Sequence, residues 1–232
     1  METNDFRQAN PRRAFLGKIA AGLTAMGLTS YFPFQALAKP TASFSPAGSA
    51  DEWFGKIKGK HRMVFDATHP HEVFPFAWPK VFLMTNEKTG TPPSECGVVV
   101  VLRHSAIGYA MENKLWEKYK LGEVFEAQDQ LTKKPATRNP FWQPKEGDFK
   151  IPGVGNVQIG INELQANGVM FCVCEMAMTV YSAAIAQQTG GDAVSIKKEF
   201  LAGILPDIQV VPSGVWALGR AQQQGCGYCF TG

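Results

Sequence analysis

"VVVVLR" at residues 98–103 is the stretch that decides the fold. Its valines and leucine show no alternation between apolar and polar positions. Such a run is typical of a strand that is buried on both faces, as in a parallel sheet covered by helices. Further strand patterns occur at 61–67, 169–174 and 208–211, and a short last strand is expected at 228–230.

Helical patterns separate these strands. Apolar residues recur at helical spacing in 112–121 and 175–191, and shorter helices are expected at 162–168, 195–204 and 213–225. The alternation predicts an α/β fold, with an open, mostly parallel β-sheet flanked by helices. Residues 122–160 break the rhythm and carry several prolines and glycines, so we expect a long loop insertion that is either functional or a contact surface.

The N-terminus has the three parts of an export signal. Arg12 and Arg13 precede a moderately apolar stretch at 19–34, and "ALA" at 36–38 suits a signal peptidase. The arginine pair resembles a twin-arginine (Tat) signal, which implies the Tat translocase as a transient partner and a periplasmic or otherwise exported location. We expect no stable membrane span after cleavage, and whether the signal is cleaved or kept as an anchor stays open. Residues 39–59 are expected to be a flexible linker with a short helix around 51–58, ahead of a domain at 60–232.

Composition excludes one class of partner. The chain has 232 residues, of which 45% are hydrophobic and 19% charged, which is ordinary for a globular protein. Residues 1–38 carry four basic and two acidic side chains, so only +1 of the formal net charge of +3 belongs to the rest. A nearly neutral domain lacks the basic surface that binding of a nucleic acid requires.

Reactive side chains follow three of the predicted strands. Asp66, His69 and His71 lie at or just beyond the end of the first strand, Arg103, His104 and Ser105 at the end of the second, and Cys174 at the end of the third. Ligands of open α/β sheets bind at the carboxyl ends of strands. A thiol at the start of a helix faces unpaired N–H groups and the positive end of the helix dipole, and both favour the nucleophilic thiolate. Cys174 is therefore the candidate nucleophile or a buried, inert cysteine, and His104 is its candidate acid/base partner. His69, His71 and Arg103 are candidate ligand-binding residues, and His69 and His71 could also hold a metal.

The other cysteines leave several alternatives open. Cys226 and Cys229 have CxxC spacing, which could form a disulfide or resolve a bond made by Cys174. A zinc site built from Cys172, Cys174, Cys226 and Cys229 is the alternative, although no cofactor is firmly implied. Covalent haem attachment is excluded at this motif because Phe230 stands where CxxCH requires histidine. Cys96 is the odd cysteine.

Three segments together resemble the DsrE/DsrF-like family, and in particular its exported members with Tat signals. They are "VVVVLRHSAIGYAM" (98–111), "GVMFCVCEMAM" (168–178) and "AGILPDIQVVPSGVWALGRAQQQGCGY" (202–228). The resemblance implies a small α/β sandwich similar to flavodoxin, which assembles as a homo-oligomer. It also implies relay of sulfur through a persulfide on a cysteine at a strand end, and that position falls on Cys174.

The function expected from these observations is a sulfur or thiol-redox role for an exported protein. Cys174 would be the nucleophile or persulfide carrier, His104 would assist, and Cys226 and Cys229 would be resolving thiols or a disulfide. Two alternatives stay open. One is a non-catalytic oligomer that binds a small ligand or a metal at the strand ends, and the other is a structural α/β protein in which a C-terminal disulfide secures the last strand. Whether the protein is an enzyme is not decided by the sequence.

Overall fold

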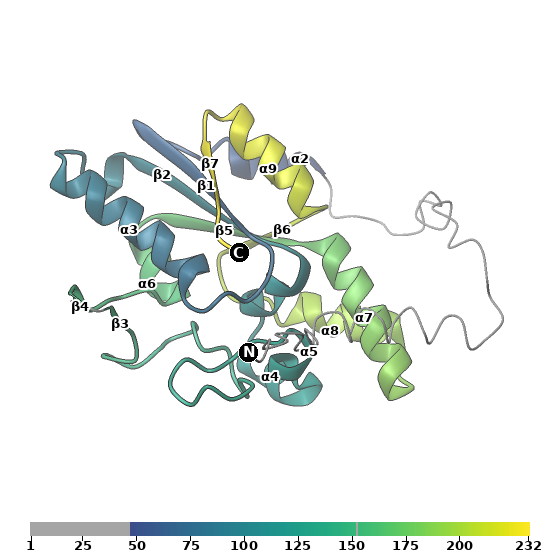
Figure 1. Ribbon diagram of the computed structural model, residues 1–232. Coiled ribbons are helices and arrows are strands. Elements are labelled where there is room, and N and C mark those ends of the chain that lie inside the picture. Colours follow the sequence, from purple (N-terminus) through teal and green to yellow (C-terminus); the bar gives the residue numbers. More distant parts are fainter. Residues whose placement is uncertain (1–46, 152) are drawn as a thin grey trace, which may run out of the picture. The chain divides into compact units, whose positions relative to one another are not determined.

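The computed structural model describes residues 47–151 and 153–232, so the predicted signal peptide lies outside the described residues. Within them, five strands form one sheet in which every neighbouring pair is parallel (Figure 1). The order across the sheet is β6 (Ile208–Val211), β5 (Val169–Cys174), β2 (Cys96–Leu102), β1 (His61–Ala67) and β7 (Gly227–Phe230). The predicted α/β fold with an open parallel sheet and flanking helices is confirmed.

The central strand β2 explains why the sequence folds this way. All seven of its residues are buried. Val98 and Val100 pack into a large hydrophobic cluster on one face of the sheet, while Val99 and Val101 pack into a second cluster on the other. An alternating strand could bury only one face, so the unbroken valine run requires helices on both sides.

Helices supply both layers. The large cluster contains residues of α3 (Phe74–Lys88), α6 (Ile161–Ala166), α7 (Glu175–Thr189) and α8 (Ala193–Ala202). The smaller cluster contains residues of α2 (Ala47–Phe54) and α9 (Gly214–Gln223), which lie together on the opposite side of the sheet from α3 and α6 (Figure 1). No helix in the described part of the chain is both long enough and apolar enough to cross a membrane.

The order in which successive strands are added across the sheet reverses once, between β6 and β7. Numbered along the sequence, the strands of the sheet lie in the order 4-3-2-1-5, whereas flavodoxin has 2-1-3-4-5. The similarity to flavodoxin therefore concerns the layers and not the strand order. The helix after β5 is α7, which packs on one face of the sheet, and the helix after β6 is α9, which packs on the other. The two connections therefore diverge between the carboxyl ends of β5 and β6, and this place is the topological switch point, where ligands of open α/β sheets bind.

Part of the predicted linker at 39–59 packs against the core, and the short helix expected there around 51–58 lies somewhat earlier in the chain. Ala47–Phe54 forms α2, and Phe54 is only 1% exposed. Its ring meets that of Trp216 on α9 edge-on, at 5.8 Å between centroids, and Ile57 is also buried. The Pro, Ser, Ala and Gly content suggests a tether, but Phe54 and Ile57 belong to the core.

Helix α3 is not indicated by the sequence pattern, because Pro75 and Pro79 lie within it. Pro75 falls in the first turn, where a missing N–H costs nothing. Pro79 lies inside the helix and removes an internal hydrogen bond. Burial of Phe76 and Leu83 against the sheet offsets that cost.

The insertion at 122–160 is mostly irregular, as predicted, but it is fastened to the core. In the described part of this segment, which follows α4 (Asn113–Tyr119), only α5 (Leu121–Val124) and the antiparallel pair β3 (Lys150–Ile151) and β4 (Gly155–Asn156) are regular. The Asn139 side chain is fully buried and donates to the carbonyl groups of Tyr109 and Met111 at 2.8 and 3.1 Å. The Phe141 ring stacks between those of Phe76 and Phe149, with centroids 4.2 and 5.0 Å away.

Two short 3₁₀ helices, η2 (Pro93–Glu95) and η3 (His104–Ala110), flank β2.

Replacement of Phe54 tests whether α2 belongs to the domain. Phe54→Ala should lower the free energy of unfolding by roughly 3–5 kcal/mol, because it empties a buried aromatic site. The exposed neighbour in Glu52→Ala should change it by less than about 0.5 kcal/mol. Urea denaturation followed by circular dichroism measures both. A tether would make the two variants equally harmless.

Candidate functional site

The carboxyl ends of the parallel strands form a rim that carries most of the predicted site residues. The register pairs Ala67 with Leu102, Leu102 with Val173, and Cys174 with Val211. The residues that follow these pairs occupy neighbouring positions along the rim, and they include Thr68, Arg103, Cys174 and Pro212. Arg103 and Cys174 thus come from adjacent strands.

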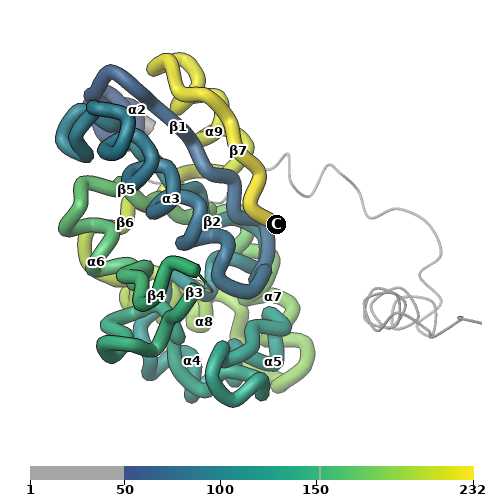
Figure 2. The backbone as a smooth tube through the Cα atoms, turned by 60° about the vertical axis from the view of Figure 1, so that its left-hand side comes forward, coloured from purple at the N-terminus to yellow at the C-terminus, as the bar shows by residue number. Residues whose placement is uncertain are grey.

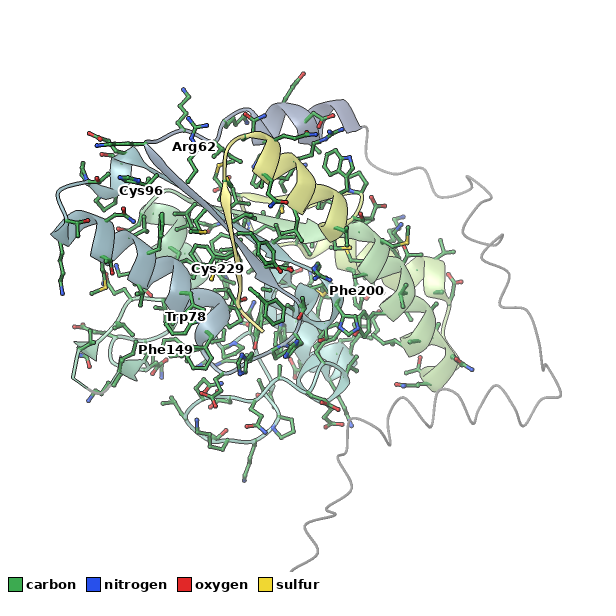
Figure 3. All side chains as sticks on the ribbon, turned by 45° about the horizontal axis from the view of Figure 1, so that its top comes forward. Arg62, Trp78, Cys96, Phe149, Phe200 and Cys229 are labelled. Atoms are coloured by element: carbon green, nitrogen blue, oxygen red, sulfur yellow. The ribbon has the colours of Figure 1, made fainter. Side chains whose placement is uncertain are left out.

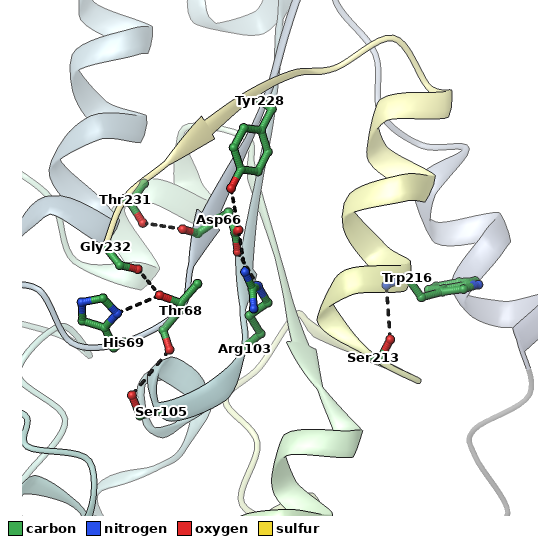
Figure 4. Close-up of polar contacts among 10 residues, drawn as sticks. All are labelled: Asp66, Thr68, His69, Arg103, Ser105, Ser213, Trp216, Tyr228, Thr231 and Gly232. Atoms are coloured by element: carbon green, nitrogen blue, oxygen red, sulfur yellow. Dashed lines mark hydrogen bonds and ion pairs between the residues drawn. The ribbon is translucent and has the colours of Figure 1, made fainter. Parts of the chain in front are cut away.

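A buried ion pair ties β1 to β2 at this rim (Figure 4). The Asp66 carboxylate is fully buried and accepts two hydrogen bonds from the Arg103 guanidinium, at 2.7 and 2.9 Å. The Tyr228 hydroxyl on β7 donates a third to the same carboxylate, at 2.8 Å. The bond to Asp66 raises the pKa of Arg103 above its ordinary value, and a smaller attraction to Cys174 adds to this. Arg103 is thus held rigidly as a cation between three strands.

The end of β7 is fastened to β1 by further hydrogen bonds. Thr231 donates its N–H and its hydroxyl to the Asp66 carbonyl at 3.1 and 3.0 Å, and the Thr68 N–H donates to the Gly232 carbonyl at 3.1 Å (Figure 4). The Thr68 hydroxyl donates to the same Gly232 carbonyl and lies 2.7 Å from Nδ1 of His69. The last strand is therefore part of the rim.

Cys174 is the N-cap residue of α7. Its Sγ accepts the N–H of Ala177 at 3.3 Å, so it receives one of the unpaired donors at the start of the helix. The side chain is 6% exposed. The carboxylate of Glu175 is buried beside it but pairs with the Lys197 ammonium at 2.8 Å, which offsets its negative charge. The thiol therefore lies at the positive end of the α7 helix dipole, at the switch point of the sheet.

His104 lies at the rim, and the hydrogen-bond partners that position its ring are Tyr181 and Ser105. Its Nδ1 is 3.5 Å from the Tyr181 hydroxyl and 3.4 Å from the Ser105 hydroxyl. Tyr181 lies two turns beyond Cys174 on α7, and burial raises the pKa of its phenol. His104 also has a left-handed backbone with φ of 50°, which costs a non-glycine residue roughly 1–2 kcal/mol and is frequent at functional sites. Whether His104 serves Cys174 stays a prediction.

His69 and His71 lie together on the loop after β1. Their rings are 5.9 Å apart between centroids, and Nδ1 of His71 is 3.3 Å from the Thr231 carbonyl. Among residues 47–151 and 153–232, no three His, Cys, Asp or Glu side chains gather so as to hold a metal ion. The pair could therefore supply only two ligands within the described part of the chain.

The predicted four-cysteine zinc site is not assembled. Two strands separate β5 from β7, which puts the terminal cysteines roughly 14 Å from Cys174 at about 4.8 Å per strand. Cys172 is fully buried in the cluster under α9, and burial raises the pKa of its thiol. The same separation prevents Cys226 or Cys229 from reaching Cys174 in this arrangement.

Cys226 and Cys229 are also apart from each other. Cys226 packs into the cluster under α9, whereas Cys229 packs against the large cluster on the other face, and both thiols are free. Three residues of extended chain span roughly 10 Å, beyond the reach of a disulfide unless the strand unwinds. Burial raises the pKa of both thiols, and that of Cys96, which lies at the opposite end of the sheet from the rim (Figure 3).

The fold and the rim define a class: an α/β protein with a cysteine at the end of a parallel strand, beside a buried arginine–aspartate pair. No family model matches the chain, and no curated protein sequence is similar to it. Among solved structures, a protein of unknown function from Methanobacterium thermoautotrophicum aligns with a TM-score of 0.38 and 16% identity. The alignment covers 74% of this chain and 99% of that one.

The buried ion pair yields a stability prediction. Arg103→Gln should cost about 2–3 kcal/mol of unfolding free energy, because the Asp66 carboxylate stays buried without its cation. This is below the cost for a fully buried pair, since the Arg103 side chain is 28% exposed. Adding Asp66→Asn should recover most of the loss, since no buried charge then remains.

Urea denaturation of the two variants measures both effects. Lys118→Gln is the control, because it breaks an exposed ion pair with Glu199 and should leave the midpoint nearly unchanged. Equal stability of Arg103→Gln and the control would show that the pair does not hold the rim.

Proposed function

We propose that this protein handles sulfur through Cys174, which accepts a sulfane sulfur and carries it as a persulfide. The observation that carries the proposal is the position of Sγ, at the start of α7 with the Ala177 N–H bonded to it and the Arg103 cation on the next strand. Helix N-termini and nearby cations both stabilise a thiolate, which is the form that attacks sulfur. The resemblance to the DsrE/DsrF-like family supports the same assignment.

The transfer needs no external oxidant. The Cys174 thiolate attacks the outer sulfur of a small persulfide donor, R–S–SH. A new S–S bond forms to Cys174 as the S–S bond of the donor breaks, and the donor leaves as the thiolate R–S⁻. The proton stays on the transferred sulfur or is lost to solvent, and attack by an acceptor thiolate repeats the exchange in the other direction.

The rim residues divide the remaining work. Arg103 stabilises the negative charge of the thiolate and of the persulfide anion, and its hydrogen bonds to Asp66 fix its position. His104, hydrogen-bonded to Tyr181 and close to the surface, is the proposed group that exchanges protons with donor and acceptor thiols.

The proposal extends to the place of action. The Tat-type signal and the family resemblance support an exported, homo-oligomeric protein that works in the periplasm. In this proposal Cys226 and Cys229 take no part in resolving Cys174, because two strands lie between them.

Sulfur loading of individual cysteines tests the proposal. The purified chain is treated with a low-molecular-weight persulfide, its remaining thiols are blocked, and peptides are analysed by mass spectrometry. We expect the mass of one added sulfur atom on the peptide that contains Cys174, and loss of that signal in Cys174→Ser. Loading should persist in Cys229→Ser, the matched control.

Arg103 has its own readout in the same experiment. The double variant Asp66→Asn, Arg103→Gln should load Cys174 roughly five- to tenfold more slowly, because the neighbouring cation is gone. Absence of sulfur on Cys174 in the folded protein, with loading of Cys229 instead, would refute the proposal.

A further inference from the structure

A groove of about 570 Å³ lies between α3 and the insertion, away from the thiol. One wall is α3 and the other is the segment around the β3–β4 hairpin, which lies beside α3 in Figure 2. Its volume is in the range of small-molecule sites. Neither Cys174 nor Arg103 lines it, so an inference about it does not depend on the proposed function.

The groove has an apolar floor that is open to solvent. Phe74 and Trp78 on α3 stack at 5.0 Å between ring centroids, and Trp78 and Val81 are each 40% exposed. Phe149 and Val154 face them from the insertion, and Val154 is 56% exposed (Figure 3, which labels Trp78 and Phe149). An exposed, concave apolar surface of this kind marks a binding site.

The edge of the groove is positively charged. Four lysines from both walls line it: Lys80, Lys88, Lys133 and Lys150. None of the four is ion-paired with a described residue. The acidic lining residues are Glu72 and Asp148, and the Asp148 carboxylate already accepts the Lys145 N–H at 2.9 Å and faces Arg138 at 3.9 Å. The groove therefore presents an excess of unpaired cations around an apolar floor.

We propose that this groove binds a small amphipathic anion. Its aromatic or alkyl body would lie against Trp78, Val81 and Phe149, and its carboxylate or sulfonate head would meet the lysines. Charge complementarity selects an anion over a neutral or cationic amphiphile. The bounded volume favours a small molecule over a second copy of the chain or a polypeptide segment.

Fluorescence of 1-anilinonaphthalene-8-sulfonate, an aromatic sulfonate, provides the test on the full chain. We expect saturable binding of one probe per chain, displaced by dodecanoate but not by dodecyltrimethylammonium, which has the same alkyl body and the opposite charge. Displacement by both would show a merely apolar surface and overturn the proposal. Loss of probe binding as protein concentration rises would show that another copy of the chain occupies the groove, and would overturn it too.

Matched variants locate the site. Lys150→Glu should weaken probe and dodecanoate binding by roughly five- to tenfold, because it reverses a charge at the edge of the groove. Lys198→Glu makes the same change in net charge on the exposed face of α8, and should alter binding by less than about twofold. Val81→Asp, a half-exposed position on α3, should abolish saturable binding. Equal effects of Lys150→Glu and Lys198→Glu, or unchanged binding in Val81→Asp, would contradict the proposal.

Discussion

The bidentate pair between Asp66 and Arg103 is the interaction on which the rim depends. It joins the ends of β1 and β2, and through the Tyr228 hydroxyl it also holds β7. The stem of Arg103 lies directly over the start of α9, where a Cβ at Gly214 would come 2.5 Å from that of Arg103. A buried carboxylate without its cation would be costly, so these four elements keep one arrangement.

The same pair sets the electrostatics of the proposed site. Arg103 is shared between Asp66, which neutralises most of its charge, and Cys174 on the next strand. The shorter-range contribution to the electrostatics of Cys174 is the hydrogen bond from the Ala177 N–H to Sγ. The start of any helix has such unpaired N–H groups, and α7 provides this one. Cys174 thus gains its setting from two features of an α/β sheet, the helix that follows a strand and the side chain that ends the neighbouring strand. For the remaining thiols burial is the largest influence, and it raises the pKa of each of them; a smaller attraction to Arg62 opposes this at Cys226.

Local pattern predicts much of this fold and less of its site. The valines of β2 are read directly as a two-sided strand, and the predicted bounds of β1, β5 and β6 match the structure. Helix α3 was missed because Pro79 contradicts a helix locally and only burial of its apolar side overrides that. Tyr228 and Tyr181 were missed because their partners, Asp66 and His104, are distant in sequence. The separation of Cys226 and Cys229 from Cys174 follows from the strand order, which is set by the return of the chain after β6 and carries no local signal.

Competitive alkylation of the native chain at neutral pH tests the central claim, that electrostatic setting and not exposure decides which thiol reacts. Limiting iodoacetamide is added, and the modified fraction of each cysteine is followed over time by mass spectrometry. Cys174 is 6% exposed and Cys229 is more exposed, so accessibility alone ranks Cys229 first. The account predicts that Cys174 is modified first. Modification of Cys229 first, with Cys174 unreactive until the protein is unfolded, would contradict it.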